Sequence, residues 1–215
     1  MIISLSGIDC AGKSTQLDCL ERALIERGHS VRRVWFRPGY SPLMDKLRLA
    51  LRKARPGSLP SASAPKAREA AFSRRGVSQA WVAMAVLDTL VNLATHVRWL
   101  SLRGETVLCD RYIEDAMVDL SLRFPELVEP EGRLRKTLVN ACPTPDIAFL
   151  LTLSKEELAR RAAIKAEPFE DPPEIRSARY ARYMSLAEAG HFVVINAEAP
   201  INDVTRSLLD ALREA

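Results

Sequence analysis

The sequence predicts an α/β fold in which a parallel sheet of about five strands is covered by helices. Segments with strand and helix patterns alternate along the whole 215-residue chain, which is typical of right-handed βαβ crossovers. The strand segments are short apolar runs without polar alternation, as expected of strands that are covered on both faces. A glycine-containing turn directly after the first apolar run predicts an anion site at the edge of this sheet.

In the first half of the chain, the apolar spacing and the end signals define each expected element. Gly28 ends the first helix, and Gly104 ends a long helix that is apolar on most sides. The expected elements are a strand at 1–5, a helix at 15–27, a strand at 30–36, a short amphipathic helix at 42–52 and the long helix at 77–103.

The second half continues the alternation of strands and helices. Ser154 is expected to cap a helix, with Glu157 in the capping-box position, and prolines separate several of the other elements. The expected elements are a strand at 106–109, helices at 114–123 and 131–142, a strand at 146–151, helices at 155–166 and 175–190, a strand at 192–195 and a closing helix at 201–214.

The composition is that of an ordinary soluble protein, with 47% hydrophobic and 27% charged residues. Its length suits one domain, so residues 1–215 are expected to form a single unit. The first strand does not resemble a signal peptide, and no apolar run is expected to reach the length needed to cross a bilayer, so we expect a cytoplasmic protein without membrane contact. Scattered cysteines without zinc-site spacing are expected to be reduced thiols, namely Cys10, Cys19, Cys109 and Cys142.

The formal charge of +4 is concentrated in a segment with several prolines and serines, which is expected to be a flexible loop at about 53–77. Between Arg52 and Arg75 the only acidic residue is Glu69. The loop is either a solvated surface segment or a mobile flap over an anionic substrate. No nucleic-acid partner is expected, because Phe72 is the only aromatic residue among these charges that could stack on bases.

A phosphate-binding pattern, G-x-x-x-x-G-K-S, runs from Gly7 to Ser14. Its glycines let successive backbone N–H groups point inward as an anion nest, and the following helix directs its positive end toward the same anion. Lys13 adds a positive charge, and the Ser14 hydroxyl is a suitable ligand for Mg²⁺. The residues expected to hold the nucleotide are Gly7, Asp9, Cys10, Ala11, Gly12, Lys13, Ser14 and Thr15.

More charged residues are expected at the same edge of the sheet, where ligands of open α/β sheets collect. Arg37 follows the second strand, and Asp110 and Arg111 follow the third. A helix beyond the fourth strand carries a basic group made of Arg160, Arg161 and Lys165.

Taken in order, these motifs resemble the thymidylate kinase family of P-loop kinases. The resemblance spans the chain, from the loop at 7–15 through an arginine motif at 36–40, the Asp-Arg-Tyr triplet at 110–112 and Pro145-Asp146 to a basic lid and a helix with Arg179 and Tyr183. It implies a P-loop NTPase fold, which is a three-layer αβα sandwich. It also implies phosphoryl transfer from ATP, with Mg²⁺, to thymidine monophosphate (dTMP) or a related nucleoside monophosphate.

The resemblance implies roles for residues of the donor side. Lys13 would contact the β- and γ-phosphates of ATP, and Ser14 and Asp110 would organise Mg²⁺. Arg111 would touch the transferred phosphoryl group, whereas on the residues alone it could equally form a surface salt bridge. Family members carry a further arginine in the phosphate loop or in the lid. Here Cys10 and Ala11 occupy the variable loop positions, so the loop has no arginine to supply. The catalytic cation is therefore expected from a lid at about 155–173, as Arg160, Arg161 or Lys165. The alternative is that these residues lie on an exposed helix face and have no catalytic role.

The acceptor side departs from the family pattern. In family members the arginine and glutamine of an Asp-Arg-x-Gln sequence hold the acceptor's phosphate and base. The corresponding stretch here is Leu87–Val91, which contains neither residue. The resemblance implies that Arg37 clamps the acceptor phosphate and Asp9 contacts the acceptor sugar, although Arg37 could also be a solvent-facing turn residue. The acceptor-binding residues expected on this basis are Asp9, Arg37 and Tyr40, with Asp88, Asp115 and Asp119 as partners for hydroxyl or amine groups.

The leading hypothesis is therefore a kinase that phosphorylates dTMP or a related nucleoside monophosphate. The first alternative is a kinase of the same fold with another small-molecule acceptor, such as a sugar or a secondary-metabolite intermediate. A nucleotide-dependent regulatory switch is less favoured, because the guanine-reading N-K-x-D pattern is absent. The helix at 77–103 is more apolar than one sheet face requires, so a homodimer through this helix is expected.

Overall fold

The structure, a computed structural model, describes residues 1–41, 44, 46, 49, 72, 75–164 and 172–214. These residues contain a five-stranded sheet with the order β2-β3-β1-β4-β5, and all neighbouring strands are parallel. The strands are β1 (Ile2–Gly7), β2 (Val31–Trp35), β3 (Thr106–Asp110), β4 (Ile147–Thr152) and β5 (Val193–Asn196). The expected α/β fold and parallel sheet are confirmed.

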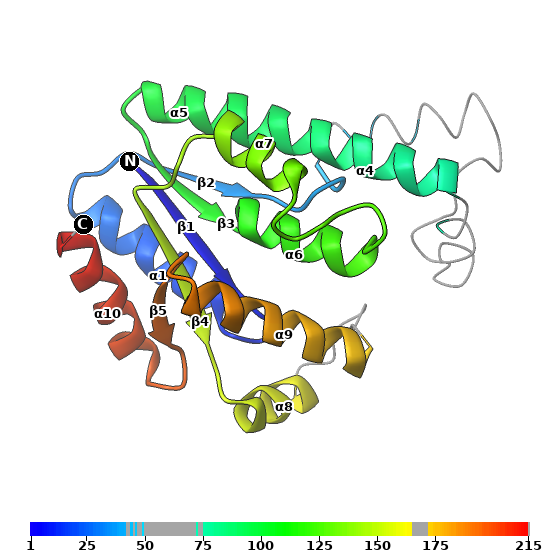
Figure 1. The fold of residues 1–215 in the computed structure, drawn as a ribbon. Helices are drawn as coiled ribbons and strands as arrows, with labels where there is room; N and C mark the ends of the chain where they lie inside the picture. The colour runs from blue at the N-terminus through cyan, green and yellow to red at the C-terminus, as the bar shows by residue number, and fades with distance from the viewer. Residues whose placement is uncertain are drawn as a thin grey trace.

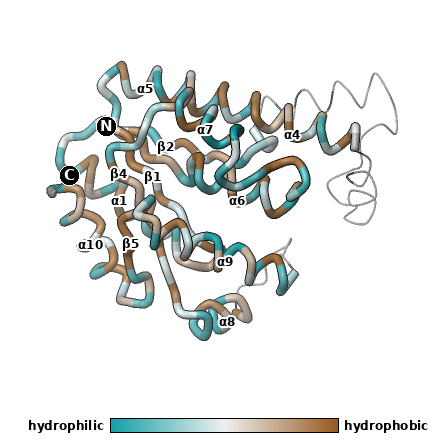
Figure 2. Tube along the Cα trace, in the orientation of Figure 1, coloured by the Kyte–Doolittle hydropathy of each residue, from teal (hydrophilic) through white to brown (hydrophobic). Residues whose placement is uncertain are grey.

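Helices cover both faces of the sheet and make three layers, as expected (Figure 1). Helices α1 (Lys13–Glu26) and α10 (Ile201–Glu214) cover one face, where Leu17, Leu20 and Leu208 pack against Ile3 and Phe149 of the strands. The alternation of polar and apolar residues along α10 is visible in Figure 2. The other face is covered by α4 (Arg75–Thr89), η1 (Leu90–Val97), α5 (Arg98–Leu102), α6 (Ile113–Arg123), α7 (Arg133–Ala141) and α9 (Pro173–Glu188).

The strand register brings three chain segments to one edge of the sheet. Asp110 at the end of β3 lies opposite Leu5 of β1 on one side and Trp35 of β2 on the other. Gly7 at the end of β1 lies opposite Leu151 of β4. The turns that follow the neighbouring strands β1, β3 and β2 therefore meet at the carboxyl edge, which is where ligands of open α/β sheets bind.

The long central helix is present, but it is not a regular α-helix throughout. It begins at Arg75, so residues 75–77 belong to the helix and not to the expected loop, and its middle part, η1, has π-helical hydrogen bonding. Single stretches of π-helix are rare and often occur near functional sites. The apolar pattern predicted the length of this helix and contained no signal for the change in winding.

The same helix corrects one expectation about membranes. Among the described residues, the segment Gly76–Leu102 is long and apolar enough, by length and composition, to cross a bilayer, so the prediction that no run reaches this length is wrong. The chain uses part of this apolar surface for its core, because Ala85, Leu93 and Val97 are fully buried over the sheet. Large apolar side chains that remain exposed on it are Leu87, Trp99 and Leu102.

Helix α8 (Lys155–Ile164) begins after the expected cap residue, but the partner of that residue's backbone N–H differs from the expected one. The Glu157 N–H donates to Ser154 Oγ at 3.3 Å, which confirms the cap residue. The Ser154 N–H donates to Glu198 Oε1 at 2.6 Å, so Glu198 takes the place that the capping box would give to Glu157. The expected helix at 42–52, except for isolated residues, most of the loop at 53–77, and Lys165 lie outside the described residues.

Candidate active site

The turn after β1 has the backbone geometry of an anion nest. Gly7 and Gly12 have φ values of 149° and 88°, and Cys10 between them has a φ of 68°. A Cβ atom at Gly7 would lie 2.8 Å from the carbonyl oxygen of Leu151, so only glycine fits beside β4. Ala11 is buried and its N–H donates to Ile8 O at 3.2 Å. Helix α1 starts directly after Gly12 and directs its N-terminal end into the turn.

Lys13 lies beneath this turn and is almost completely buried. Its Nζ donates to the carbonyl oxygens of Gly7 and Ile8 at 2.7 and 2.8 Å, and lies 3.7 Å from Asp9 Oδ1. Burial and the nearby charge of Arg111 lower the pKa of Lys13 to about 8. The ammonium group is thus fixed at the base of the nest in an environment that disfavours its charge.

Arg111 connects the turn after β1 with the turn after β3. It has a φ of 77°, which is uncommon for a residue with a side chain, and its N–H donates to Leu5 O at 3.1 Å. Its Nη2 donates to Asp9 Oδ1 at 2.6 Å. Burial alone would raise the pKa of Asp9, but Lys13 and Arg111 outweigh it and lower that pKa to about 2. Asp9 is therefore ionised at neutral pH and its charge is matched by two cations.

A hollow of about 420 Å³ opens over the nest. Predicted residues that line it are Asp9, Cys10, Gly12, Lys13, Ser14, Thr15, Asp110, Arg111 and Arg161. Two more lining residues, Trp35 and Ile164, were not predicted; the position of Trp35 at the carboxyl end of β2 was the signal that could have found it. Ser14 and Thr15 are exposed, as hydroxyls offered to a ligand must be.

Asp110 lines this hollow from the last position of β3. Burial raises its pKa despite the charges of Lys13 and Arg111. No cluster of three or more His, Cys, Asp or Glu side chains suited to a metal ion occurs within the described part of the chain. A hydroxyl and a single carboxylate, Ser14 and Asp110, fit a hard cation such as Mg²⁺, which completes its shell with water and phosphate oxygens.

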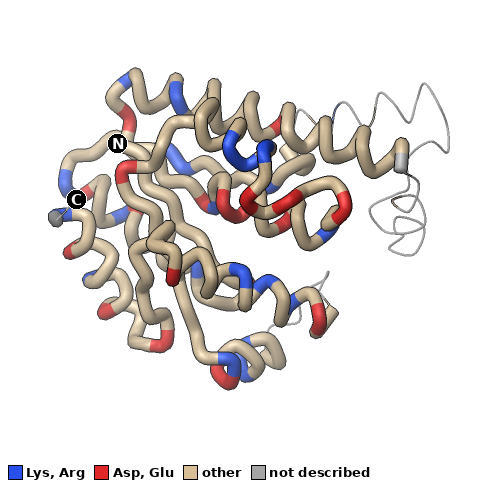
Figure 3. The backbone as a smooth tube through the Cα atoms, in the orientation of Figure 1, with Lys and Arg blue, Asp and Glu red and all other residues tan. Residues whose placement is uncertain are grey.

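The two described arginines of the expected lid have different positions. Arg161 lines the hollow, and its Nη2 donates to Ala197 O at 3.0 Å while its Nε donates to Glu157 at 2.6 Å. Arg160 pairs with the same Glu157 but is 62% exposed and does not line the hollow. Figure 3 shows the basic residues of α8 and α9 on the side of the molecule where these helices extend beyond the sheet.

Arg37 and Tyr40 follow β2 on the other side of the nest. The Arg37 guanidinium carbon lies 5.2 Å from the centre of the Tyr40 ring, and Arg37 Nε lies 3.3 Å from Asp119 Oδ2. The second oxygen of Asp119 accepts a hydrogen bond from Arg179, which is almost buried. Asp119 is therefore at the expected edge, but its carboxylate is already shared between two arginines.

Asp88 is not available to an acceptor, contrary to the expectation. It is fully buried, and its carboxylate accepts hydrogen bonds from Gly39 N at 2.8 Å, from the Ser41 hydroxyl and from Asn92 Nδ2 at 2.9 Å. These hydrogen bonds hold the turn after β2 against the central helix. The neighbouring Thr89 is also fully buried and donates to Ala85 O at 2.8 Å.

Asp115 is a structural residue as well, so this expectation is also corrected. It is 1% exposed and accepts hydrogen bonds from the Ser6 hydroxyl, the Tyr112 N–H and the Tyr183 hydroxyl, at 2.6, 2.8 and 2.6 Å. Buried carboxylates require such complete hydrogen bonding, and these donors leave it no exposed surface for a substrate.

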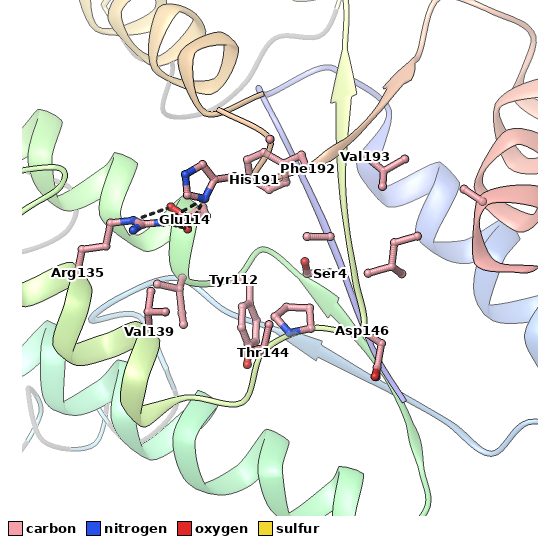
Figure 4. A pocket seen from close by; sticks show the side chains of 16 residues that line it. Ser4, Tyr112, Glu114, Arg135, Val139, Thr144, Asp146, His191, Phe192 and Val193 are labelled. Atoms are coloured by element: carbon pink, nitrogen blue, oxygen red, sulfur yellow. Dashed lines mark hydrogen bonds and ion pairs between the residues drawn. The ribbon is translucent and has the colours of Figure 1, made fainter. Parts of the chain in front are cut away.

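A larger hollow of about 800 Å³ lies away from the nest, between α7 and the start of β5 (Figure 4). Its one arginine is already paired, among the residues that the structure describes, because Arg135 donates to both carboxylate oxygens of Glu114, at 2.6 and 3.3 Å. His191 Nδ1 lies 3.1 Å from the same guanidinium. The carboxylate of Asp146, also in the lining, accepts a hydrogen bond from Ile2 N at 2.6 Å. The wall thus offers no cation free of a carboxylate among its described residues, so the larger hollow is a poorer site for a polyphosphate than the nest.

Comparison with known proteins agrees with this geometry. The family model for thymidylate kinase matches residues 65–208. The thymidylate kinase of Leifsonia xyli subsp. xyli is 28% identical, with 97% of this chain and 92% of the relative covered. That of Deinococcus radiodurans is also 28% identical, over 100% of this chain and 97% of the relative, and a probable thymidylate kinase of Sulfurisphaera tokodaii is 22% identical, over 98% and 94%. The chain therefore belongs to the thymidylate kinase family.

Proposed function

We propose that this kinase transfers the γ-phosphoryl group of ATP to the phosphate of dTMP, giving ADP and thymidine diphosphate. The observation that carries the proposal is the convergence of Lys13, Arg111 and Arg161 on one hollow above a phosphate nest. Arg37 follows β2, the strand next to β3, and would hold the acceptor phosphate. Named thymidylate kinases that match nearly the whole chain support dTMP as the acceptor.

The roles of the donor-side residues follow from their positions. The nest and Lys13 would hold the β- and γ-phosphates, and Arg111 and Arg161 would balance the charge that spreads over the transferred group. Ser14 and Asp110 would hold Mg²⁺, which neutralises phosphate charge when it is bound. Asp9, kept ionised by its cations, would accept a hydrogen bond from a hydroxyl of the acceptor sugar. The acceptor oxygen is already anionic, so these residues act mainly by orientation and electrostatics.

A second candidate is a kinase of the same family with another small-molecule acceptor. The observation that favours it is that Asp88 and Thr89, in the stretch where family members read the base, are fully buried and hydrogen-bonded within the protein. Val91 beside them has no hydrogen-bonding side chain. A screen of acceptors distinguishes the two candidates, because the second predicts ATP binding without turnover of dTMP.

The assembly is a further part of the proposal. Residues 1–215 would form one kinase unit, with the segment at about 155–173 as its lid. Two such units would associate through the central helix, where Leu87, Trp99 and Leu102 are 53%, 51% and 82% exposed. Exposed apolar side chains of this size on one helix are typical of a surface that another chain covers.

We expect steady conversion of dTMP to the diphosphate with ATP and Mg²⁺, and loss of at least about a hundredfold in turnover for Lys13→Ala, which is on the order of 3 kcal/mol in the barrier. A coupled assay of ADP release with a panel of acceptors measures both. Wild-type protein that is silent with dTMP but active with another acceptor would favour the second candidate, and ATP hydrolysis without any acceptor dependence would favour a switch.

The lid residues give a paired prediction. Arg161→Ala should reduce the turnover of dTMP by at least about tenfold, since it removes a cation that faces the transferred group. Arg160→Ala serves as the matched control, because Arg160 shares the partner Glu157 but does not line the hollow, and its turnover should stay within about twofold. Equal losses in the two variants would show that Arg161 has no special role.

The pKa of Lys13 predicts how ATP binding depends on pH. In the free protein this pKa is about 8. A polyphosphate beside the ammonium group would raise the pKa of Lys13. At a pH above about 8, ATP binding would therefore be coupled to protonation of Lys13. Affinity for ATP should therefore fall as the pH rises above about 8, by up to about tenfold per pH unit. Titration calorimetry between about pH 7 and pH 9.5 measures this. A Lys13→Ala variant with the same pH dependence would contradict the assignment.

The dimer is tested by charge placed on the exposed helix surface. Leu102→Glu should shift sedimentation at micromolar concentration toward the monomer, because a buried charge without a partner is unfavourable in an interface. Ile25→Glu on α1 is the matched control, with an exposed apolar residue on the opposite face of the sheet. A wild-type protein that is monomeric under these conditions would remove the proposed assembly.

A further inference from the structure

Asp119 forms the middle of a three-residue chain of charges on the acceptor side. It lies one helical turn after Asp115 on α6, and its two oxygens contact arginines from different elements, Arg179 of α9 and Arg37 after β2. The exposed fractions of the side chains increase along this chain, from 7% for Arg179 through 13% for Asp119 to 42% for Arg37. The buried Arg179 thus holds the carboxylate of Asp119, and this carboxylate contacts the more exposed guanidinium of Arg37.

The contact uses one side of the Arg37 guanidinium. Asp119 Oδ2 lies 3.3 Å from Nε, and the two terminal nitrogens are the remaining donors of the planar group. A guanidinium can hold a carboxylate at Nε and a phosphate at its terminal nitrogens at the same time, because the fork is rigid and planar. Asp119 therefore restricts the orientation of Arg37 without occupying the whole group.

Asp119 is also suited to remain in place when a second anion approaches. Burial would raise its pKa, but Arg179, Arg37 and Arg111 outweigh burial and lower it, so the carboxylate stays ionised. Displacement from Arg179 would break an ion pair in which both side chains are largely buried, which is costly. Arg37 has the most exposed side chain of the three and so the most contact with solvent and solutes.

We infer that Asp119, anchored by Arg179, is a positioning residue that orients the Arg37 guanidinium toward the phosphate of the acceptor. This inference rests on the proposed function, because it assigns the acceptor phosphate to Arg37. In this inference Arg179 acts on Arg37 through Asp119. The opposite possibility, that Asp119 competes with the acceptor for Arg37, makes a prediction of the opposite sign.

The test is a double-mutant cycle with dTMP as the acceptor. Asp119→Asn should raise the KM for dTMP by about tenfold while kcat and the affinity for ATP stay within about threefold. Arg37→Ala should raise the KM further, and adding Asp119→Asn to Arg37→Ala should then have no effect, because there is no guanidinium left to orient. A purely structural role would give independent effects that multiply in the double variant.

Two further variants separate positioning from folding. Asp119→Asn combined with Arg179→Met removes both buried charges, so it keeps the core neutral and should retain the raised KM even where Asp119→Asn alone is less stable. Glu131→Gln is the matched control, because it removes ion pairs with Arg182 of the same helix α9, at 3.0 Å, and with Arg135 of α7, at 3.3 Å, neither of which involves Arg37. Its KM for dTMP should equal that of the wild-type protein.

The outcomes are distinct. A raised KM in both Asp119 variants that disappears in the Arg37→Ala background supports the inference. An unchanged or lowered KM, or effects that multiply in the double variant, overturns it and leaves the proposed function intact. Wild-type protein that does not phosphorylate dTMP overturns the proposed acceptor, and the inference falls with it.

Discussion

The buried carboxylate of Asp115 is the interaction on which the geometry of the candidate site depends. Its three hydrogen bonds come from Ser6 at the end of β1, from the backbone of Tyr112 after β3 and from Tyr183 on α9. It thereby fixes the two central strand ends and one covering helix to a single point. The nest and the Asp-Arg-Tyr turn are each within a few residues of one of these donors, and Arg179, which pairs with Asp119 on the acceptor side, lies on the same helix as Tyr183.

Two consequences follow from this arrangement. Arg111 Nη1 lies 3.8 Å from Asp115 and its Nη2 contacts Asp9, so a residue with an unfavourable backbone angle is held by charges on two sides. Asp119 lies on the same face of α6 as Asp115, four residues later, and is therefore directed at α9 and at the turn after β2. Helix α6 thus carries both Asp115, which contacts the donor side, and Asp119, which contacts Arg37 on the acceptor side.

The sequence predicted the fold and the meeting of the donor-side residues at one edge of the sheet, because local patterns encode both. The glycine spacing and strand order require Gly7, Lys13, Asp110 and Arg111 to meet at one edge, and they do. The prediction that Asp88 and Asp115 contact the acceptor was wrong. The sequence alone does not show whether an aspartate side chain faces a ligand or the interior of the protein. Burial of Asp88 and Asp115 depends on contacts with residues 49 and 109 positions away, to Gly39 and Ser6, which no local pattern contains.

The most direct test is a crystal structure with a non-hydrolysable ATP analogue and dTMP bound together. The account predicts the β- and γ-phosphates in the nest within hydrogen-bond distance of Lys13, and the acceptor phosphate on the terminal nitrogens of Arg37 with Asp119 still at Nε. It would be contradicted by a triphosphate bound outside the nest, or by an acceptor phosphate that has no contact with Arg37.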